Sequence, residues 1–429
     1  MHALRAFLVS ALALAPAISI SAQEVLRTPT VQNLPPVQAA PPMPGVYTLE
    51  QISQLAMANS PVLRQARARV DQTEGLAVQA GLYPNPMQNS GNPNQLGGNG
   101  SLYSVGFQQE IVRANKLGLN QSAAMQNVRQ ANLEFIRQRF ELLTDLRQQF
   151  FILLAAQQRV TTLTELRAIA EQSTSTSQKL LQGGQGSEPD VLLLRVELRR
   201  IEASLRSAEA ATVAARRQLA ALTGLVDLKI DRVLGDLMLP LPDFNDPQVR
   251  QQLLTTSSLV ESARAEVARN QFLLQRAEVE VIPNLILNSG YQWQGNLPHS
   301  QALIGVYFNI PIWDRNQGNI RAAGANVRQA NAQFNAVQND LVRQLAEALG
   351  RYRAAQSVVA LYETGILPDA KRTLKLVQQA YEAGQVEFLK ILQTQRSLVE
   401  AQLDFITAEQ ERVTAAADIA GLLQLDQFP

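Results

Sequence analysis

The feature that most constrains this chain is an internal duplication. The hexapeptide NVRQAN occurs at Asn127–Asn132 and again at Asn326–Asn331, about 200 residues later. The flanking segments follow in the same order at nearly the same separation. They include YPNP and IPNL, which begin at Tyr83 and Ile282, and QGGQGSEPDVL and EAGQVEFLKIL, which begin at Gln182 and Glu382. We therefore expect two structural repeats of one design, at residues 46–240 and 244–425.

Each repeat is predicted to contain a helix, two strands and a long helical hairpin. The strands are expected at about 83–92 and 102–111, and at about 285–294 and 302–311; the hairpins are expected at about 116–224 and 316–424. Apolar residues at helical spacing, as at Phe140, Leu143 and Leu146, mark the hairpins. Each outgoing helix would be roughly 100 Å long. The predicted fold class is mainly α with a small β part.

The predicted strands carry apolar and polar residues in alternation, with one apolar and one polar or small face. The apolar residues expected to face lipid are Tyr103, Val105, Phe107, Leu285, Leu287, Tyr291, Trp293, Ile304, Val306 and Phe308. Strands of about ten residues with this pattern are typical of membrane β-barrels. The alternative is a half-buried strand of a soluble sandwich, which four strands among so many helical residues would build poorly.

Four strands cannot close a barrel, because the smallest membrane barrels need about eight. An open sheet edge in lipid would leave backbone groups without partners. If the strands span a membrane, several chains must therefore share one barrel, and their number is left open at this point.

The N-terminal residues have the pattern of an export signal. Arg5 is followed by an apolar run to about Ile20, which predicts a signal peptide at residues 1–22. Residues 23–45 are rich in proline and are expected to form a linker. No later window is apolar enough for a membrane-spanning helix, so we expect an exported protein without a helical anchor.

Charge and composition argue against several functions. The 38 basic and 37 acidic residues leave a net charge of +1, so nothing steers the chain toward nucleic acid. The chain has no Cys, and its two His are His2 in the leader and His299 in an expected loop. No convergent set of catalytic side chains is visible, and we predict no enzyme activity, no cofactor and no metal site.

With this plan, the chain resembles the TolC family of outer-membrane efflux proteins. The resemblance covers nearly all of Tyr47–Leu425 and is carried by YTLEQISQLAMANSPVLRQARARV, GLYPNP and YEAGQVEFLKILQTQRSLVEAQLDF. The first two segments are most similar to the branch that serves heavy-metal and cation exporters. The resemblance implies a homotrimer with a twelve-stranded outer-membrane β-barrel and a periplasmic α-helical barrel.

The implied function is a passive duct in the outer membrane of a Gram-negative-type cell. Its partners would be outer-membrane lipid, a periplasmic adaptor and an inner-membrane pump of the RND type, and its cargo would include heavy-metal cations. A type I secretion or drug-efflux duct of the same fold is an alternative. Another is a periplasmic coiled-coil protein without a pore, which would share the helices but would not need the four strands.

The resemblance also implies two kinds of site. The expected adaptor-docking tips are Gly184, Gln185, Gly186, Ser187, Gly384, Gln385 and Val386, and the candidate periplasmic gate is Glu188, Asp190, Lys390 and Gln393. Some family members carry an acidic cation-binding ring near the last tip. Lys390 and Gln393 stand at the matching positions, so that ring is absent here. Glu188 and Asp190 have a simpler interpretation as acids favoured at a helix start.

Overall fold

The computed structural model describes most of the two expected repeats. The described residues are 45–91, 102–184, 186–244, 246–294, 300–383, 385–386 and 388–428. The chain divides into two compact units, Met1–Pro42 and Met43–Pro429, and every described residue belongs to the second. The expected signal peptide and nearly all of the linker lie outside the described residues, as do the tip residues Gln185 and Gly384.

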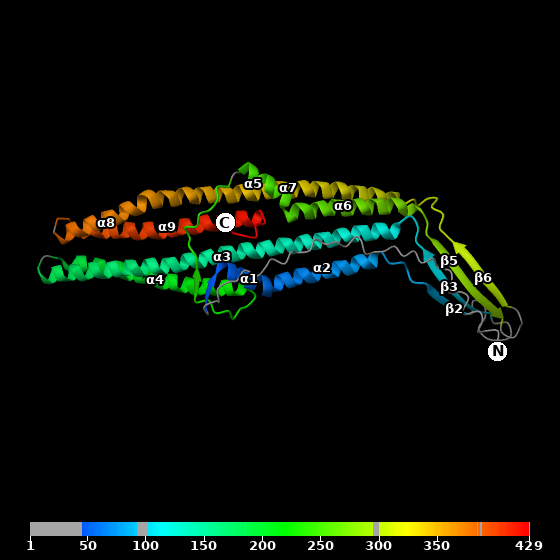
Figure 1. The fold of residues 1–429 in the computed structure, drawn as a ribbon, viewed down its shortest axis with the longest axis horizontal. Helices are drawn as coiled ribbons and strands as arrows, with labels where there is room; N and C mark the ends of the chain where they lie inside the picture. The colour runs from blue at the N-terminus through cyan, green and yellow to red at the C-terminus, as the bar shows by residue number, and fades with distance from the viewer. Residues whose placement is uncertain are drawn as a thin grey trace. The chain divides into compact units, whose positions relative to one another are not determined.

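Four described strands form one antiparallel sheet beyond one end of the helices (Figure 1). They are β2 (Met87–Gly91), β3 (Leu102–Ile111), β5 (Leu285–Gln294) and β6 (Ser300–Tyr307), in the order β2-β3-β5-β6. β3 comes from the first repeat and β5 from the second, and they pair along their whole length. The bounds of these two central strands coincide with those expected from the alternating pattern.

The first outer strand starts later than expected, at Met87 instead of about residue 83. Pro84 and Pro86 lie in the missing part, and neither has a backbone N–H to donate to a neighbouring strand. The sheet ladder therefore begins only after the second proline.

The other outer strand, β6, was expected at 302–311 but runs from Ser300 to Tyr307, so Phe308 lies just beyond it. Pro311 cannot donate to a ladder. The N–H of Ile312 donates to the carbonyl of Ile310 (3.0 Å), which makes a tight turn and takes the chain out of the sheet.

Each repeat begins with two helices, where one was expected. They are α1 (Leu49–Asn59) and α2 (Pro61–Ala80) in the first repeat, and α5 (Asp246–Thr256) and α6 (Ser258–Glu278) in the second, where a 3₁₀ turn, Val279–Val281, follows. The first break falls at Ser60, whose hydroxyl caps α2 by accepting from the N–H of Leu63 (3.5 Å). Pro61 begins α2, where its missing N–H costs nothing.

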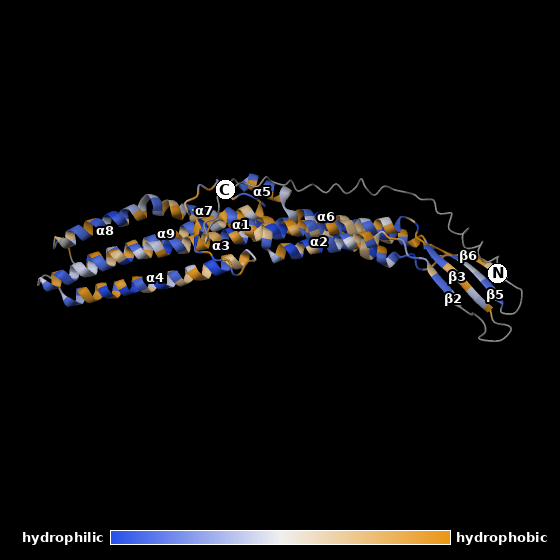
Figure 2. Ribbon diagram, turned by 60° about the horizontal axis from the view of Figure 1, so that its bottom comes forward, coloured by the Kyte–Doolittle hydropathy of each residue, from blue (hydrophilic) through white to orange (hydrophobic). Residues whose placement is uncertain are grey.

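The long hairpins fill most of the remaining chain. The first is α3 (Lys116–Gln182) and α4 (Glu188–Leu222); the second is α7 (Gln317–Leu361), α8 (Leu367–Glu382) and α9 (Phe388–Leu422). Hydrophobic and hydrophilic residues are interleaved along these helices (Figure 2), as helix packing on one side requires. The second hairpin, expected at about 316–424 with an unbroken outgoing helix, differs from that prediction in one place. A π-helical turn, Tyr362–Ile366, separates α7 from α8, because Pro368 cannot supply the normal helical hydrogen bond.

The strand-to-helix turns use left-handed backbone at equivalent positions of the two repeats. Asn115 (φ 55°) precedes α3 and Asn316 (φ 59°) precedes α7. Asparagine tolerates this conformation better than most residues. In the first of these turns Ala114 (φ 56°) is left-handed as well.

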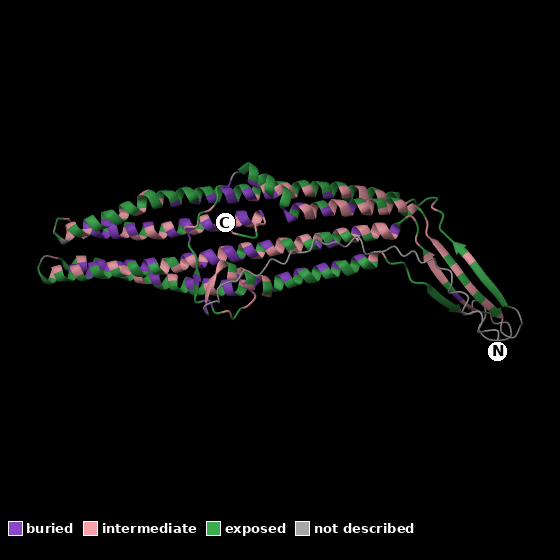
Figure 3. Ribbon diagram, in the orientation of Figure 1, coloured by how far each residue is buried: buried purple, intermediate pink, exposed green. Residues whose placement is uncertain are grey.

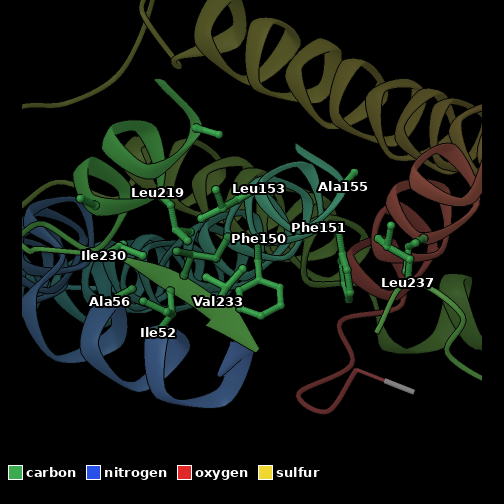
Figure 4. Packing of buried hydrophobic residues seen from close by; sticks show 14 of the residues in the cluster. Ile52, Ala56, Phe150, Phe151, Leu153, Ala155, Leu219, Ile230, Val233 and Leu237 are labelled. Atoms are coloured by element: carbon green, nitrogen blue, oxygen red, sulfur yellow. The ribbon is translucent and has the colours of Figure 1, made fainter. Parts of the chain in front are cut away.

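Buried residues lie along the helices, whereas the sheet is almost entirely exposed or half-buried (Figure 3). One core cluster packs Ile52 of α1, Phe150 of α3 and Leu219 of α4 against Val233 (Figure 4). Val233 belongs to β4 (Arg232–Leu234), which pairs in parallel with β1 (Val46–Thr48). This short pair was not predicted from the sequence, and it holds the start of the first repeat against its hairpin.

The C-terminal segment packs back onto α3. Arg147 is buried and donates from Nη2 to the carbonyls of Leu425 (2.9 Å) and Asp426 (2.8 Å). Its guanidinium lies over the ring of Phe428, 5.5 Å from the centroid, and burial lowers the pKa of Arg147. This contact joins the end of the second repeat to the long helix of the first.

Candidate duct-forming surfaces

The strand register gathers the predicted lipid-facing residues on one face of the sheet. β3 pairs Tyr103 with Trp293, and β6 pairs Val306 with Leu287. Directly opposed residues point to the same face. Nine of the ten predicted residues share this face, and the tenth, Phe308, lies past the end of β6.

This apolar face is the more exposed of the two. Ile304 is 83% exposed and Phe107 is 57% exposed. Along β5 the odd-numbered residues from Leu287 to Trp293 are exposed, whereas the alternate residues, such as Asn288, are half-buried. A sheet in water normally shows the reverse, with its apolar face packed on a core. An exposed apolar face of this extent marks a surface that contacts a membrane or a partner.

Aromatic side chains concentrate at the end of this face that lies away from the helices. The rings of Tyr103 and Trp293 stack at a centroid distance of 5.7 Å, and Tyr291 lies 6.2 Å from Trp293. Tyrosine and tryptophan are the residues that membrane proteins concentrate at the boundary between lipid and water.

The opposite face carries mainly small and polar residues, with Ile286, Leu303 and Tyr307 among its exceptions. Gln108 pairs with Asn288, and Gly106 pairs with Gly290. A Cβ on Gly106 would lie 2.8 Å from the carbonyl oxygen of Ser289, so this position has no room for a side chain. Such a face suits contact with water.

The outer strands leave both sides of the sheet unpaired. β2 pairs only with β3, and β6 only with β5, in the described part of the chain. Each outer strand therefore presents a row of backbone donors and acceptors that can pair with another strand.

The hairpin ends lie at the opposite end of the helices from the sheet (Figure 1). Gly184 has φ +74°, a left-handed conformation that favours glycine, and a Cβ there would meet open space. The Ser187 hydroxyl caps α4 by accepting from the N–H of Asp190 (3.4 Å). Gly184, Ser187 and Gln385 are exposed, and Gly186 and Val386 are half-buried. The described tip residues are thus at the surface.

The four candidate gate residues do not form a cluster. Glu188, Lys390 and Gln393 are exposed, and Asp190 is half-buried. Glu188 and Asp190 occupy the first turn of α4, where the helix dipole favours carboxylates. No hydrogen bond or ion pair joins any two of the four residues within the described ranges.

The two hairpins are joined by polar contacts that the sequence analysis missed. Both Nε and Nη2 of Arg396 on α9 donate to Oε2 of the buried Glu197 on α4 at 2.9 Å. Gln395 Nε2 donates to the buried Ser173 hydroxyl on α3 (2.5 Å). The partners lie in different repeats, so no local pattern could have paired them.

A buried carboxyl lies beside the π-helical turn. Burial raises the pKa of Glu409 to about 7; Arg412 opposes the shift, and the charges of Asp236 and Glu363 add to it. Glu409 is therefore partly protonated near neutral pH.

A groove of about 360 Å³ lies among α3, α7 and α9 and is lined by charged, polar and apolar side chains. Arg351 donates to Asp418 (2.7 Å), and burial together with the Asp418 charge raises the pKa of Asp145. Among the described residues, no group of three or more His, Asp or Glu side chains is placed to hold a metal ion. None of the described helices combines the length and the apolar character needed to cross a membrane.

Comparisons with known proteins agree with this geometry. The family model described as "Outer membrane efflux protein" matches residues 249–423, which make up most of the second repeat. A curated relative, the cobalt-zinc-cadmium resistance protein CzcC of Cupriavidus metallidurans, is 27% identical over 380 residues. That alignment covers 88% of this chain and 90% of the relative.

Solved structures share the fold. A membrane protein from Pseudomonas aeruginosa superimposes with a TM-score of 0.78 at 18% identity, covering 87% of this chain and 92% of that one. The outer membrane protein VceC of Vibrio cholerae superimposes with a TM-score of 0.74 at 18% identity, covering 88% of this chain and 96% of that one. The family is one of efflux channels and not of enzymes. In its repeat plan, in the exposed apolar face of its sheet and in its sequence over residues 249–423, the chain is similar to the outer membrane efflux proteins.

Proposed function

We propose that this chain is the outer-membrane duct of a tripartite efflux system that exports heavy-metal cations. Its similarity to outer membrane efflux proteins supports a location in the outer membrane, with a large helical part in the periplasm. The observation that carries the proposal is the sheet whose apolar face is exposed. Its apolar face is open along β3, β5 and β6, and both of its outer edges are unpaired.

The sheet is a fraction of a barrel. An unpaired edge is not tolerated in lipid, and a barrel requires about eight strands or more. β6 of one copy beside β2 of the next satisfies both edges. Three copies then close one barrel of twelve strands, with the face that carries Gln108 and Asn288 toward the water-filled interior.

The helices extend this duct into the periplasm. α3 alone has 67 residues, or about 100 Å of helix. The proposed docking surface for the periplasmic adaptor is the pair of hairpin tips, because they lie farthest from the sheet and keep Gly184, Ser187 and Gln385 at the surface. Glu188, Asp190, Lys390 and Gln393 remain the proposed gate.

The cargo is assigned from the relative that is named for cobalt, zinc and cadmium resistance. The whole sequence has no Cys and only two His, and these are the side chains that bind such ions most tightly. We therefore assign selection of the cation to an inner-membrane pump of the RND type, and a passive role to the duct.

The test compares two deletions in the source organism, one of the gene for this chain and one of the gene for the pump that serves it. Growth is measured against cobalt, zinc and cadmium salts and against a panel of drugs. Equal sensitisation to the three cations in both strains, restored by the full-length chain, supports the proposal. Sensitisation by loss of the pump alone, or sensitisation to drugs without the cations, would contradict the pairing or the cargo.

A further inference from the structure

The helices next to the sheet form a row that ends, like the sheet, in two unpaired edges. α2 packs against α3, α3 against α6, and α6 against α7, which leaves α2 and α7 at opposite ends of the row (Figure 1). α2 leads into β2 and α7 follows β6. In the proposed barrel, where β6 of one copy lies beside β2 of the next, α7 of the first copy therefore lies beside α2 of the next.

The duplication shows how this contact between copies is arranged. Within one chain, β3 lies beside β5 and α3 packs against α6. In the other repeat, β6 and α7 correspond to β3 and α3, and β2 and α2 correspond to β5 and α6. The contact between α3 and α6, which we call the intrachain seam, is therefore a template for the contact of α7 with α2 of the next copy, the intercopy seam.

The repeated segments give the equivalent residues of the two seams. The two copies of NVRQAN align α3 with α7, and RQARARV (Arg64–Val70) aligns α2 with ESARAEV (Glu261–Val267) on α6. The edges of the row are thus compared position by position with a seam whose contacts are known.

Alanines that are buried in the intrachain seam have exposed equivalents on α2 and α7. Ala265 of α6 is 1% exposed, whereas the equivalent Ala68 of α2 is exposed. Ala123 of α3 is 5% exposed, whereas the equivalent Ala322 of α7 is exposed. Small side chains let packed helices approach closely. The two edges therefore carry the same close-packing residues as the intrachain seam, and the proposed assembly covers them with the next copy.

One carboxylate joins the charged groups of the intrachain seam. Arg129 Nη2 of α3 donates to Oε2 of Glu261 on α6 (2.7 Å), and Arg264 donates to the other oxygen of the same carboxylate. Glu261 is half-buried in this arrangement. Two guanidinium groups are thus neutralised in part by one acid.

The intercopy seam keeps the arginines but lacks the acid. Arg328 stands at the position of Arg129, Arg67 at the position of Arg264, and Arg64 at the position of Glu261. In the described part of the chain, neither Arg64 nor Arg328 makes a side-chain hydrogen bond or an ion pair. Arg67 Nε lies 3.6 Å from Asp71, an exposed pair of little strength. Three cations that meet without an anion repel one another.

A second polar contact of the intrachain seam can be repeated between copies without an added ion. Gln130 Nε2 donates to Glu266 (2.8 Å). The equivalent residues are Gln329 and Arg69. An amide group both donates and accepts hydrogen bonds, so Gln329 can accept from an arginine where Gln130 donates to a carboxylate. The charge imbalance is therefore confined to the three arginines.

We infer that an oxyanion of the phosphate class binds at each intercopy seam, held by Arg328 of one copy and by Arg64 and Arg67 of the next. It takes the place that the Glu261 carboxylate has in the intrachain seam. The planar guanidinium group matches phosphate oxygens with two parallel hydrogen bonds. About 24 Å of helix separates Arg64 from the end of α2 at Ala80, so the anion comes from solution and not from a lipid headgroup.

This inference rests on the edge-to-edge assembly of the proposed function and adds a ligand that stabilises it. The test uses the full-length trimer in detergent, identified by its mobility in unheated gels. The temperature at which the trimer dissociates is measured at increasing concentrations of inorganic phosphate, with sodium chloride adjusted to hold the ionic strength constant.

Three variants separate the site from a general effect of salt. Arg328→Gln removes one of the three guanidinium groups. Arg64→Glu restores, between copies, the arrangement that Glu261 makes within the chain. Arg372→Gln removes one exposed charge from α8, outside the intercopy seam, and serves as the control.

Phosphate should raise the dissociation temperature of the wild-type chain and of Arg372→Gln by a few degrees, and the rise should saturate. Arg328→Gln should need at least a tenfold higher phosphate concentration for the same rise. Arg64→Glu should not respond to phosphate, and in chloride alone it should dissociate at a higher temperature than the wild-type chain. An equal response of all four proteins, or a less stable Arg64→Glu trimer in chloride, would overturn the site.

The same experiment separates this inference from the proposed function. If the wild-type chain forms trimers whose dissociation temperature does not depend on phosphate, the anion site is wrong and the shared barrel stands. If no trimer forms in any buffer, the edge-to-edge assembly fails, and the proposed duct fails with it.

Discussion

Replacing Phe107 with arginine should strongly destabilise the membrane-inserted protein. Phe107 is opposite Ser289, which is opposite Ile304, and this level lies midway between Trp293 and Leu285. An arginine facing lipid at the middle of a barrel costs about 2–4 kcal/mol. Loss of the phenylalanine from an apolar environment adds about 1.5–3 kcal/mol. Phe107→Arg should therefore cost roughly 4–7 kcal/mol per copy.

The matched control is the next residue in the same strand. Gln108 points to the opposite face, where it pairs with Asn288 and Met87. In the proposed barrel this face lines the water-filled interior, so Gln108→Arg should cost less than about 1 kcal/mol. The pair of variants differs in position by one residue and introduces the same side chain, so a difference between them reports the face alone.

The assay is urea-dependent folding into vesicles, followed by the gel mobility of unheated samples, which separates inserted from unfolded protein. The wild-type chain and Gln108→Arg should show similar midpoints, and Phe107→Arg should need a much lower urea concentration to unfold. Equal costs for the two variants, or a larger cost for Gln108→Arg, would refute the assignment of the apolar face to lipid.

Three further changes test the helical part by thermal unfolding. Because the pKa of Glu409 is raised from 4.5 to about 7, the contribution of its protonated carboxyl to stability is full below about pH 4.5 and is lost as the pH rises through 7. The free energy of unfolding of Glu409→Gln should therefore equal that of the wild-type chain at about pH 4 and exceed it by roughly 3 kcal/mol at about pH 8. A difference that does not change with pH would contradict this. Arg147→Met removes two hydrogen bonds to C-terminal carbonyls, so it should cost about 2–4 kcal/mol of stability and make the C-terminal segment more sensitive to protease. Unchanged digestion would argue against the role of Arg147 in holding that segment. Gly224→Ala should cost about 1–3 kcal/mol, because φ is +76° and the new Cβ would lie 2.7 Å from the carbonyl oxygen of Asn59; a neutral result would reject that geometry.

The central part of the fold can be predicted from the sequence because the same pattern of segments occurs in both repeats. The duplication aligns the repeats, and uninterrupted alternation sets the ends of β3 and β5. The predicted helix and strand bounds are wrong where a proline interrupts a segment whose apolar residues are otherwise regularly spaced. Pro86 delays β2, β6 ends at Tyr307 because its partner β5 begins only at Leu285, after Pro283, and Pro368 forces the π-helical turn.

Contacts between distant segments could not be predicted in the same way. β1 and β4 have three residues each, too few to show alternation, and they pair across most of a repeat. The Glu197–Arg396 ion pair exists only because the two hairpins pack together. The docking tips and the gate remain predictions from the family resemblance; Glu188, Asp190, Lys390 and Gln393 show no mutual contact in the described structure that would reveal a gate.

The most direct test of the account is whether outer strands of different copies pair in the membrane. The chain has no Cys, so Ser90→Cys on β2 can be combined with Ala302→Cys, Ile304→Cys or Val306→Cys on β6, all on the lipid-facing side. After oxidation in outer membranes, non-reducing gels should show at least one combination that links copies into a ladder ending at three. A ladder that continues beyond three, or no cross-link in any combination, would contradict a shared trimeric barrel.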